Sequence, residues 1–335
     1  MFKENVSLLP YNTFGIDVKA SHFSSFQSVE DLKRLLSIEQ DLPIFVLGGG
    51  SNVLLTQDIK ARVLKNEITG KEIVHEDQER VTVKVGAGEN WHEFVLFALD
   101  KNWGGIENLS LIPGSVGASP MQNIGAYGVE IKDVFESLEA LNLETLALET
   151  FSHQDCQFGY RESVFKRSLK GKYIITSVTY RLHKKHQLNT SYGAIEQELE
   201  SQHITSPTIK DVSEAVIAIR TSKLPDPKEI GNAGSFFKNP VVPKTTLSSI
   251  QLEYPDVPFY PIDEEQVKLP AGWLIEKAGW KGKRFEQYGV HKKQALVLVN
   301  YGGAKGEDIY ALSTKILEDV LHKFNVSLER EVNIV

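Results

Sequence analysis

The sequence predicts an α+β fold, because segments typical of strands and of helices are both present but do not alternate strictly. A doubly wound parallel sheet would need repeated strand–helix–strand units along the chain. Hydrophobic residues make up 41% of the 335 residues, which is enough for two packed domains of about 150 residues each. The sequence therefore predicts two lobes of mixed helices and strands.

Charge and composition narrow the class of protein. The formal net charge is -7, whereas binding to a phosphate backbone needs a basic face. No apolar run approaches the ~20 residues that span a bilayer, and the first residues lack the apolar core of a secretory signal. Cys156 is the single cysteine, so an intrachain disulfide is impossible. We expect a cytoplasmic protein that binds neither nucleic acid nor membrane.

The first elements are predicted from periodicity and caps. Acidic residues after Ser28 open a short helix, and residues 81–85 alternate with period two as a half-buried strand does. The clearest helix begins at Trp91, where one face carries Trp91, Phe94, Val95, Ala98 and Leu99. Asn90 and Glu93 are a typical cap pair for its first turn.

Later elements lead to a predicted domain boundary. Residues 173–182 are rich in β-branched and aromatic residues and predict a strand. A helix is predicted over 211–223, with an apolar stripe formed by Val212, Ala215, Val216 and Ile219. This helix must end near its last residue because Pro225 and Pro227 cannot continue it. The break at 224–227 is the predicted boundary between domains.

Two further elements are predicted near the end of the chain. A long helix is expected over 309–324, with a stripe formed by Ile309, Leu312, Ile316, Leu317, Val320, Leu321 and Phe324. Residues 326–335 alternate and predict a strand. Before them, residues 231–240 form a small-residue loop that runs into two phenylalanines.

Two glycine-rich loops indicate a ligand. Residues 110–128 are too rich in small residues for a helix or a strand interior and too apolar for a disordered linker. A second small-residue turn, 48–52, follows the apolar run 43–47. Glycine lets a backbone approach a ligand closely, and backbone N–H groups can cradle phosphate oxygens. Together the loops predict an extended, phosphate-rich ligand such as a dinucleotide.

Several common motifs are missing. The turn 48–52 does not complete G-x-G-x-x-G, because Val53 occupies the third glycine position, and no P-loop pattern is present. The nine histidines lack the spacing of a metal site, and no G-x-S-x-G elbow appears. We therefore expect no metal, and neither a nicotinamide-type Rossmann domain nor a P-loop NTPase nor a common serine hydrolase.

Three polar residues occur in contexts that suggest chemistry. Arg161 follows Gly159 and Tyr160, and its planar fork suits a carboxylate. Ser235 lies between a glycine-rich turn and two phenylalanines, and Glu331 lies on the strand face opposite Val332. From pattern alone, a salt bridge, a turn serine and an exposed glutamate remain open for these three.

Five segments together resemble the UDP-N-acetylenolpyruvoylglucosamine reductase family. They are Gly-Gly-Gly-Ser-Asn at 48–52, Ile-Pro-Gly-Ser-Val-Gly-Ala at 112–118, Gln-Asn-Ile-Gly-Ala-Tyr-Gly at 122–128, Gly-Tyr-Arg at 159–161, and Gly-Asn-Ala-Gly-Ser-Phe-Phe-Lys-Asn-Pro at 231–240. Each segment alone is weak, whereas the ordered set covers nearly the whole chain and is highly specific.

The resemblance implies a domain plan and an FAD site. It implies an FAD-binding region of the vanillyl-alcohol-oxidase (PCMH) type at 15–184, a lid loop with a connecting helix at 185–223, a smaller α+β substrate-binding domain at 224–325, and a C-terminal strand at 326–335 that returns to the active site. The implied FAD contacts are Gly48, Gly49, Gly50, Ser51, Asn52, Pro113, Gly114, Ser115, Gly117, Ala118, Asn123, Ile124, Gly125 and Gly128.

The resemblance also implies the reaction. NADPH would reduce the FAD, which then transfers hydride to the enolpyruvyl group of UDP-N-acetyl-3-O-(1-carboxyvinyl)-glucosamine and yields UDP-N-acetylmuramate for peptidoglycan. Ser235 matches the proton donor, and Arg161 and Glu331 match the pair that stabilises charge at the substrate carboxylate. An ionised Glu331 would repel that charge, so we hypothesise that it is protonated in the reactive complex.

Four further positions match substrate contacts of the family. Tyr192 resembles a lid tyrosine over the UDP diphosphate, as in the longer subclass of the family, and Lys223, Asn239 and Gln294 match polar contacts. A helix cap for Lys223 and a turn aromatic for Tyr192 are the structural alternatives.

We expect the protein to be a monomer. An oxygen-using oxidase of small alcohols or sugars and a non-catalytic nucleotide-sugar or flavin-binding protein are the rival functions.

Overall fold

The computed structural model describes residues 1–38 and 41–335 and divides into two compact units. The first unit contains residues 1–6, 21–49 and 60–222, and the second contains residues 7–20, 50–59 and 223–335. Each unit is therefore assembled from segments that are distant in the sequence.

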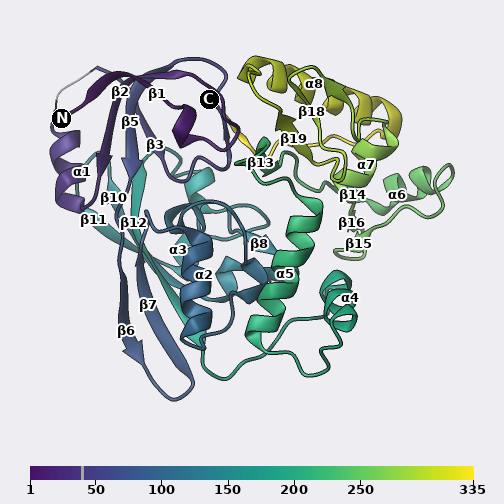
Figure 1. The fold of residues 1–335 in the computed structure, drawn as a ribbon, viewed down its shortest axis with the longest axis horizontal. Helices are drawn as coiled ribbons and strands as arrows, with labels where there is room; N and C mark the ends of the chain where they lie inside the picture. Colours follow the sequence, from purple (N-terminus) through teal and green to yellow (C-terminus); the bar gives the residue numbers. More distant parts are fainter. Residues whose placement is uncertain (39–40) are drawn as a thin grey trace. The chain divides into compact units, whose positions relative to one another are not determined.

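The first unit is built on a five-stranded antiparallel sheet (Figure 1). Its spatial order is β11 (Leu148–Ser152), β10 (Phe135–Asn142), β12 (Tyr173–His183), β7 (Arg80–Gly86) and β6 (Lys71–Glu76). The predicted strands at 81–85 and 173–182 are confirmed as parts of β7 and β12. Val81, Val83 and Val85 are fully buried, because alternate residues of a strand share one face.

Helix α2 (Trp91–Asp100) carries part of the core of this unit, and its predicted start is confirmed. The Asn90 side chain accepts the Glu93 N–H at 3.1 Å, which caps the first turn. The rings of Trp91 and Phe94 lie 5.9 Å apart, and each contacts the buried Tyr180 of β12. An aromatic cluster thus holds α2 within the same core as the sheet.

The remaining elements of the first unit are a smaller sheet and short helices. The sheet has the order β1 (Lys3–Ser7), β2 (Lys19–Phe26), β5 (Ile59–Asn66) and β3 (Ile44–Leu47). The helices are α1 (Val29–Leu36), α3 (His153–Cys156), α4 (Gly193–Ser201) and α5 (Ile209–Lys223), and a two-stranded sheet joins β8 (Gly125–Ala126) to β9 (Val129–Glu130). The predicted short helix after Ser28 is confirmed as α1, and Ser28 Oγ caps it by accepting the Asp31 N–H at 3.0 Å. Helix α5 ends at Lys223, as Pro225 requires.

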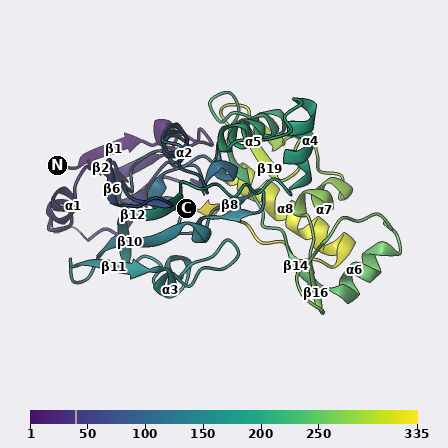
Figure 2. The ribbon, with the colours of Figure 1, turned by 90° about the horizontal axis from the view of Figure 1, so that it is seen from below.

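The second unit contains a four-stranded sheet and the longest helix. The sheet has the order β13 (Gly231–Ser235), β19 (Val297–Asn300), β18 (Tyr288–Val290) and β17 (Arg284–Phe285). Helix α8 (Gly306–Phe324) packs on β18, β19 and α7 (Ala271–Lys277), as Figures 1 and 2 show. A separate small sheet joins β14 (Val241–Pro243), β16 (Gln266–Lys268) and β15 (Tyr260–Pro261), with α6 (Lys244–Gln251) beside it. Helix α8 was predicted correctly, although Leu321 of its expected stripe is 46% exposed.

The C-terminal strand is shorter than the alternating pattern predicts. Only β20 (Asn333–Ile334) is a strand, and it pairs in parallel with β4 (Val53–Leu54). The segment before it pairs at a single bridge, Phe237 with Arg330, which is too short to form a ladder.

The N-terminal part of this unit contains the turn Leu9–Tyr11. Beside this turn, the Asn12 side chain donates to the backbone carbonyls of Leu8 and Ile16.

Candidate functional site

The two predicted glycine loops meet backbone to backbone within the first unit. A Cβ on Gly49 would lie 2.8 Å from the Cα of Gly114, and a Cβ on Gly48 would lie 2.6 Å from Ser115 Oγ. Real Cβ atoms do not approach so closely, so side chains are excluded from this contact. Gly114 also has φ 126°, a conformation that favours glycine. At Gly49 and Gly114 the two loops thus meet main chain to main chain, with the Ser115 side chain beside Gly48.

A lysine lies beside the first of these turns. Lys65 Nζ donates a hydrogen bond of 2.8 Å to the carbonyl of Gly48. Burial lowers the pKa of this ammonium group below its usual range, and Glu67 acts in the opposite direction. No local sequence pattern predicts a role for Lys65, because the contact joins the end of β5 to the loop that follows the neighbouring strand β3.

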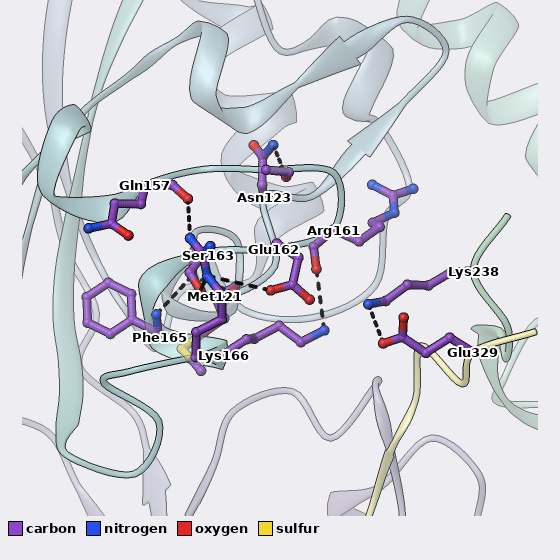
Figure 3. Close-up of polar contacts among 12 residues, drawn as sticks. Met121, Asn123, Gln157, Arg161, Glu162, Ser163, Phe165, Lys166, Lys238 and Glu329 are labelled. Atoms are coloured by element: carbon purple, nitrogen blue, oxygen red, sulfur yellow. Dashed lines mark hydrogen bonds and ion pairs between the residues drawn. The ribbon is translucent and has the colours of Figure 1, made fainter. Parts of the chain in front are cut away.

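Three alternate positions of the 110–128 loop hold the turn that carries Arg161, and Figure 3 draws two of them, Met121 and Asn123. Ser163 Oγ donates to the Met121 carbonyl at 2.6 Å, and Asn123 Nδ2 donates to the Gly159 carbonyl at 3.0 Å. Arg161 Nη2 donates to the Gly125 carbonyl at 2.7 Å. Ser163 and Asn123 are fully buried. Three hydrogen bonds therefore hold the loop and the Arg161 turn together.

Arg161 itself is held in a rarely occupied backbone conformation. Its φ is 55°, and Gly159 and Glu162 close the turn around it with reciprocal backbone hydrogen bonds of 3.0 and 3.2 Å. A non-glycine residue in the left-handed region costs of order 1 kcal/mol or more, and such strain clusters at functional sites. The Arg161 guanidinium group also lies 5.7 Å from the Tyr160 ring centroid. The turn and the aromatic contact together fix where the cation lies.

A second cation contacts the same loop and was not predicted. Arg220 of α5 donates from Nε to the Leu111 carbonyl at 3.3 Å, and its guanidinium group hydrogen-bonds Tyr127. Burial lowers the pKa of Arg220 and raises that of Tyr127. The Tyr192 ring meets the Tyr127 ring edge-on, with centroids 5.3 Å apart. The predicted lid residue Tyr192 thus contacts the glycine-rich loop through one aromatic ring.

The second unit brings Ser235 and Glu331 onto neighbouring segments. Ser235 is the last residue of β13, opposite Val297, and follows Gly234, whose φ is 68°. The Glu331 N–H donates to the carbonyl of Phe236, the next residue after Ser235, at 2.8 Å. Both candidate residues are half-buried. Asn52, at the end of the first glycine turn, donates from Nδ2 to the Glu331 carbonyl at 3.3 Å.

Two predicted substrate contacts meet at the start of α7. Asn239 Oδ1 accepts the Ala271 N–H at 2.9 Å, and a Cβ on Gly272 would lie 3.0 Å from Gln294 Oε1. The residue before α7 is a proline with no side-chain cap, so Asn239 supplies the missing acceptor. Lys223, in contrast, is exposed at the end of α5. Arg161 and Tyr192 belong to the first unit, and Ser235 and Glu331 belong to the second.

Other kinds of site find little support. Within residues 1–38 and 41–335, no three His, Cys, Asp or Glu side chains gather in a group that could hold a metal ion. Burial raises the pKa of the Cys156 thiol to about 12, so it is a poor nucleophile. Among the helices described, none combines the length and apolar character needed to cross a bilayer.

The comparisons with known proteins identify the family. Residues 226–335 match the C-terminal domain of UDP-N-acetylenolpyruvoylglucosamine reductase, and residues 21–145 match an FAD binding domain. The chain is 55% identical over 334 residues to the UDP-N-acetylenolpyruvoylglucosamine reductase of Flavobacterium johnsoniae, covering 99% of each chain. The chain belongs to the UDP-N-acetylenolpyruvoylglucosamine reductase family. A reductase of the same name from Pseudomonas putida is 51% identical over 335 residues, 99% of this chain and 98% of that one.

A solved member of the reductase family shares the fold. The crystal structure of UDP-N-acetylenolpyruvylglucosamine reductase from Thermus caldophilus matches with a TM-score of 0.69 at 24% identity, over 100% of this chain and 99% of that one. The predicted α+β fold, with an FAD-binding domain followed by the reductase C-terminal domain, is confirmed.

Proposed function

We propose that the chain is an FAD-dependent UDP-N-acetylenolpyruvoylglucosamine reductase. It reduces the enolpyruvyl ether of UDP-N-acetyl-3-O-(1-carboxyvinyl)-glucosamine with electrons from NADPH and yields UDP-N-acetylmuramate for peptidoglycan synthesis. The observation that carries this proposal is the 55% identity to the Flavobacterium johnsoniae reductase over 99% of both chains. The matched FAD binding domain at residues 21–145 supports the cofactor.

The glycine loops fit the cofactor. Gly49 and Gly114 lie so close that a Cβ on Gly49 would have no room at this contact. Main-chain groups are therefore available there, and backbone N–H groups suit a diphosphate. Bound FAD, once reduced by NADPH, would supply the hydride that the enolpyruvyl group accepts. We propose that the residues that hold it are Gly48, Gly49, Gly50, Ser51, Asn52, Pro113, Gly114, Ser115, Gly117, Ala118, Asn123, Ile124, Gly125 and Gly128.

Three side chains carry the chemistry in this proposal. Arg161 offers its guanidinium fork to the substrate carboxylate, where negative charge grows as hydride arrives at the methylene carbon. Ser235 protonates the adjacent carbon. A hydroxyl is a weak acid, and it can do so because the carbanion or enolate that forms there is strongly basic. Glu331, in its protonated form, donates a hydrogen bond to the same carboxylate. The 2.8 Å bond between Glu331 N and the carbonyl of Phe236 supports a shared role with Ser235.

We further propose the finer features of the longer subclass. Tyr192 acts as a lid residue over the UDP diphosphate, with Lys223, Asn239 and Gln294 as polar contacts of the sugar nucleotide. The edge-on contact of Tyr192 with Tyr127 and the shared position of Asn239 and Gln294 at α7 support these roles. In this proposal residues 15–184 bind FAD, 185–223 form the lid and connecting helix, 224–325 bind substrate, and 326–335 return to the active site. The protein acts as a monomer in the cytoplasm.

Anaerobic mixing separates this function from its rivals. The purified protein is first titrated with FAD and then mixed with NADPH without oxygen. Bleaching of the flavin, followed by its reoxidation on addition of the enolpyruvyl sugar nucleotide, supports the reductase. Reoxidation by oxygen alone would favour an oxidase of small alcohols or sugars. A protein that takes up no FAD would favour a binding module.

A further inference from the structure

The segment that carries Glu331 is fixed by very few backbone contacts. Lys238 N donates to the Glu329 carbonyl at 2.9 Å, and Glu331 N donates to the Phe236 carbonyl at 2.8 Å. These two bonds flank the single bridge between Phe237 and Arg330. So short a ladder is marginal by itself. The next backbone pairing begins at Asn333, where β20 joins β4. Between Glu329 and Glu331, side chains add to these two backbone bonds.

One side-chain contact lies on the Ser235 side of this segment. Lys238 Nζ forms an ion pair of 2.6 Å with Glu329 Oε1, as Figure 3 shows. Only 9% of the Lys238 side chain is exposed, whereas 70% of the Glu329 side chain is. An ion pair so exposed on one side stabilises weakly. It does not by itself explain how the next residues keep their direction.

Arg330 binds one turn of α8 through three side-chain contacts. Its Nε donates to Ser313 Oγ at 2.8 Å, and its Nη2 donates to Thr314 Oγ1 at 2.7 Å. The guanidinium carbon lies 4.6 Å from the Tyr310 ring centroid, a cation–π contact. Three contacts from one planar fork fix both the position and the rotation of this side chain.

The two acceptors on α8 are themselves held in place. Ser313 Oγ donates to the Tyr310 carbonyl at 2.6 Å, and Thr314 Oγ1 donates to the same carbonyl at 3.1 Å. Each hydroxyl proton is thus used within the helix, which leaves the oxygen lone pairs for Arg330. Ser313 is fully buried, so the geometry is shielded from competing water.

We propose that Arg330 is a positioning residue of the reductase, which directs the neighbouring Glu331 toward the substrate by locking the segment to α8. In an extended segment, successive side chains point to opposite faces. Fixing Arg330 on α8 therefore fixes the direction of Glu331 on the other face. Arg330 acts through Glu331 and does not touch the substrate. This inference rests on the proposed reductase function.

Half-reactions measured by anaerobic stopped flow test the role. In Arg330→Ala, flavin reduction by NADPH and the dissociation constant of FAD should stay within about twofold, because neither needs Glu331. Reoxidation by the enolpyruvyl sugar nucleotide should slow by about 10²-fold, as expected when a reacting group is misplaced by about 1 Å. If Arg330→Ala does not fold, the double variant Ser313→Ala with Thr314→Val tests the same role. It removes both acceptors but keeps the charge of Arg330, and it should slow reoxidation in the same way.

A double-mutant cycle separates positioning from general stabilisation. If Arg330 acts through Glu331, then Arg330→Ala added to Glu331→Ala should slow reoxidation no further. The matched control is Arg284→Ala, which removes another arginine–aromatic contact of the same unit, 4.0 Å from the Tyr301 ring, and should reoxidise normally. Equal losses in both half-reactions, additive effects in the cycle, or an unchanged reoxidation rate would overturn the role. If the wild-type flavin is not reoxidised by the sugar nucleotide, the proposed function fails instead.

Discussion

Glu331 donates its backbone N–H to the carbonyl of Phe236 at 2.8 Å, and Phe236 directly follows Ser235. One main-chain hydrogen bond therefore joins the segments that carry Ser235 and Glu331, which are almost a hundred positions apart. The Glu331 carbonyl in turn accepts from Asn52 Nδ2 at 3.3 Å, so the same residue is tied to the end of a glycine turn. Glu331 has its backbone held from two sides, which suits a group that must meet a substrate in one orientation.

The hypothesis that Glu331 is protonated predicts unequal effects of two substitutions. Glu331→Gln keeps a neutral hydrogen-bond donor of similar size, so it should slow reoxidation of the reduced flavin by the enolpyruvyl substrate less than about tenfold. Glu331→Ala removes the donor and should slow it by about 10²–10⁴-fold. Anaerobic stopped flow measures both, with Glu318→Gln on the exposed face of α8 as control. Equal losses in the Gln and Ala variants, or a pH–rate profile with Glu331 ionised throughout the active range, would reject the hypothesis.

The contact between the glycine loops predicts that one methyl group is harmful. Gly49→Ala would place a Cβ 2.8 Å from Gly114 Cα, and a backbone atom cannot move aside as a flexible side chain can. We expect a loss of about 1–3 kcal/mol in unfolding free energy and weaker FAD binding, measured by denaturant titration and flavin fluorescence. Gly193→Ala is the control, because a Cβ there meets open space. If both variants bind FAD as the wild type does, the loops are not a tight cradle.

His92 predicts a loss of stability in mildly acidic solution. Its Nδ1 accepts the Leu111 N–H at 3.0 Å, and burial, assisted by Arg220 and opposed by Glu93, lowers the pKa of the imidazole. Because protonation is harder in the folded state, the unfolded state binds more protons below about pH 6.5. The stabilisation is therefore complete above about pH 6.5 and is lost as the pH falls further through the folded-state pKa.

Thermal unfolding between pH 7.5 and 5.0 measures this effect. His92→Gln keeps an acceptor that does not titrate, so its Tm should fall less with acidification than that of the wild type. His183 and His291 also have lowered pKa values, so the wild-type curve contains their effects and only the difference between proteins reports on His92. His75→Gln, whose side chain is 70% exposed, is the control. Parallel curves for wild type and His92→Gln would show that His92 carries no such role.

Local sequence patterns predicted the helices and strands, but they did not predict the contacts between distant segments. The cap at Asn90 acts within four residues, so sequence alone locates it. The loop 110–128 was predicted as a main-chain surface from its glycines, but its anchors lie in the turn 159–163 and on α5, which no local pattern connects. Arg220 was missed for that reason.

The C-terminal segment shows the same limit. Alternation predicted a strand over 326–335, although only Asn333–Ile334 finds a continuous partner. The position of Arg330 in the sequence says nothing about α8, whose Ser313 and Thr314 it contacts. A period-two pattern reports which faces are apolar, whereas pairing depends on distant segments.

Ser235→Ala tests the proposed proton donor most directly, with each half-reaction followed by anaerobic stopped flow. NADPH should bleach the flavin of this variant within about twofold of the wild-type rate, whereas reoxidation by the enolpyruvyl sugar nucleotide should fall by about 10²–10⁴-fold. Ser248→Ala, which loses only a hydroxyl bonded to the Lys244 carbonyl on α6, should match the wild type in both halves. Equal loss in the two half-reactions of Ser235→Ala would contradict its role as proton donor.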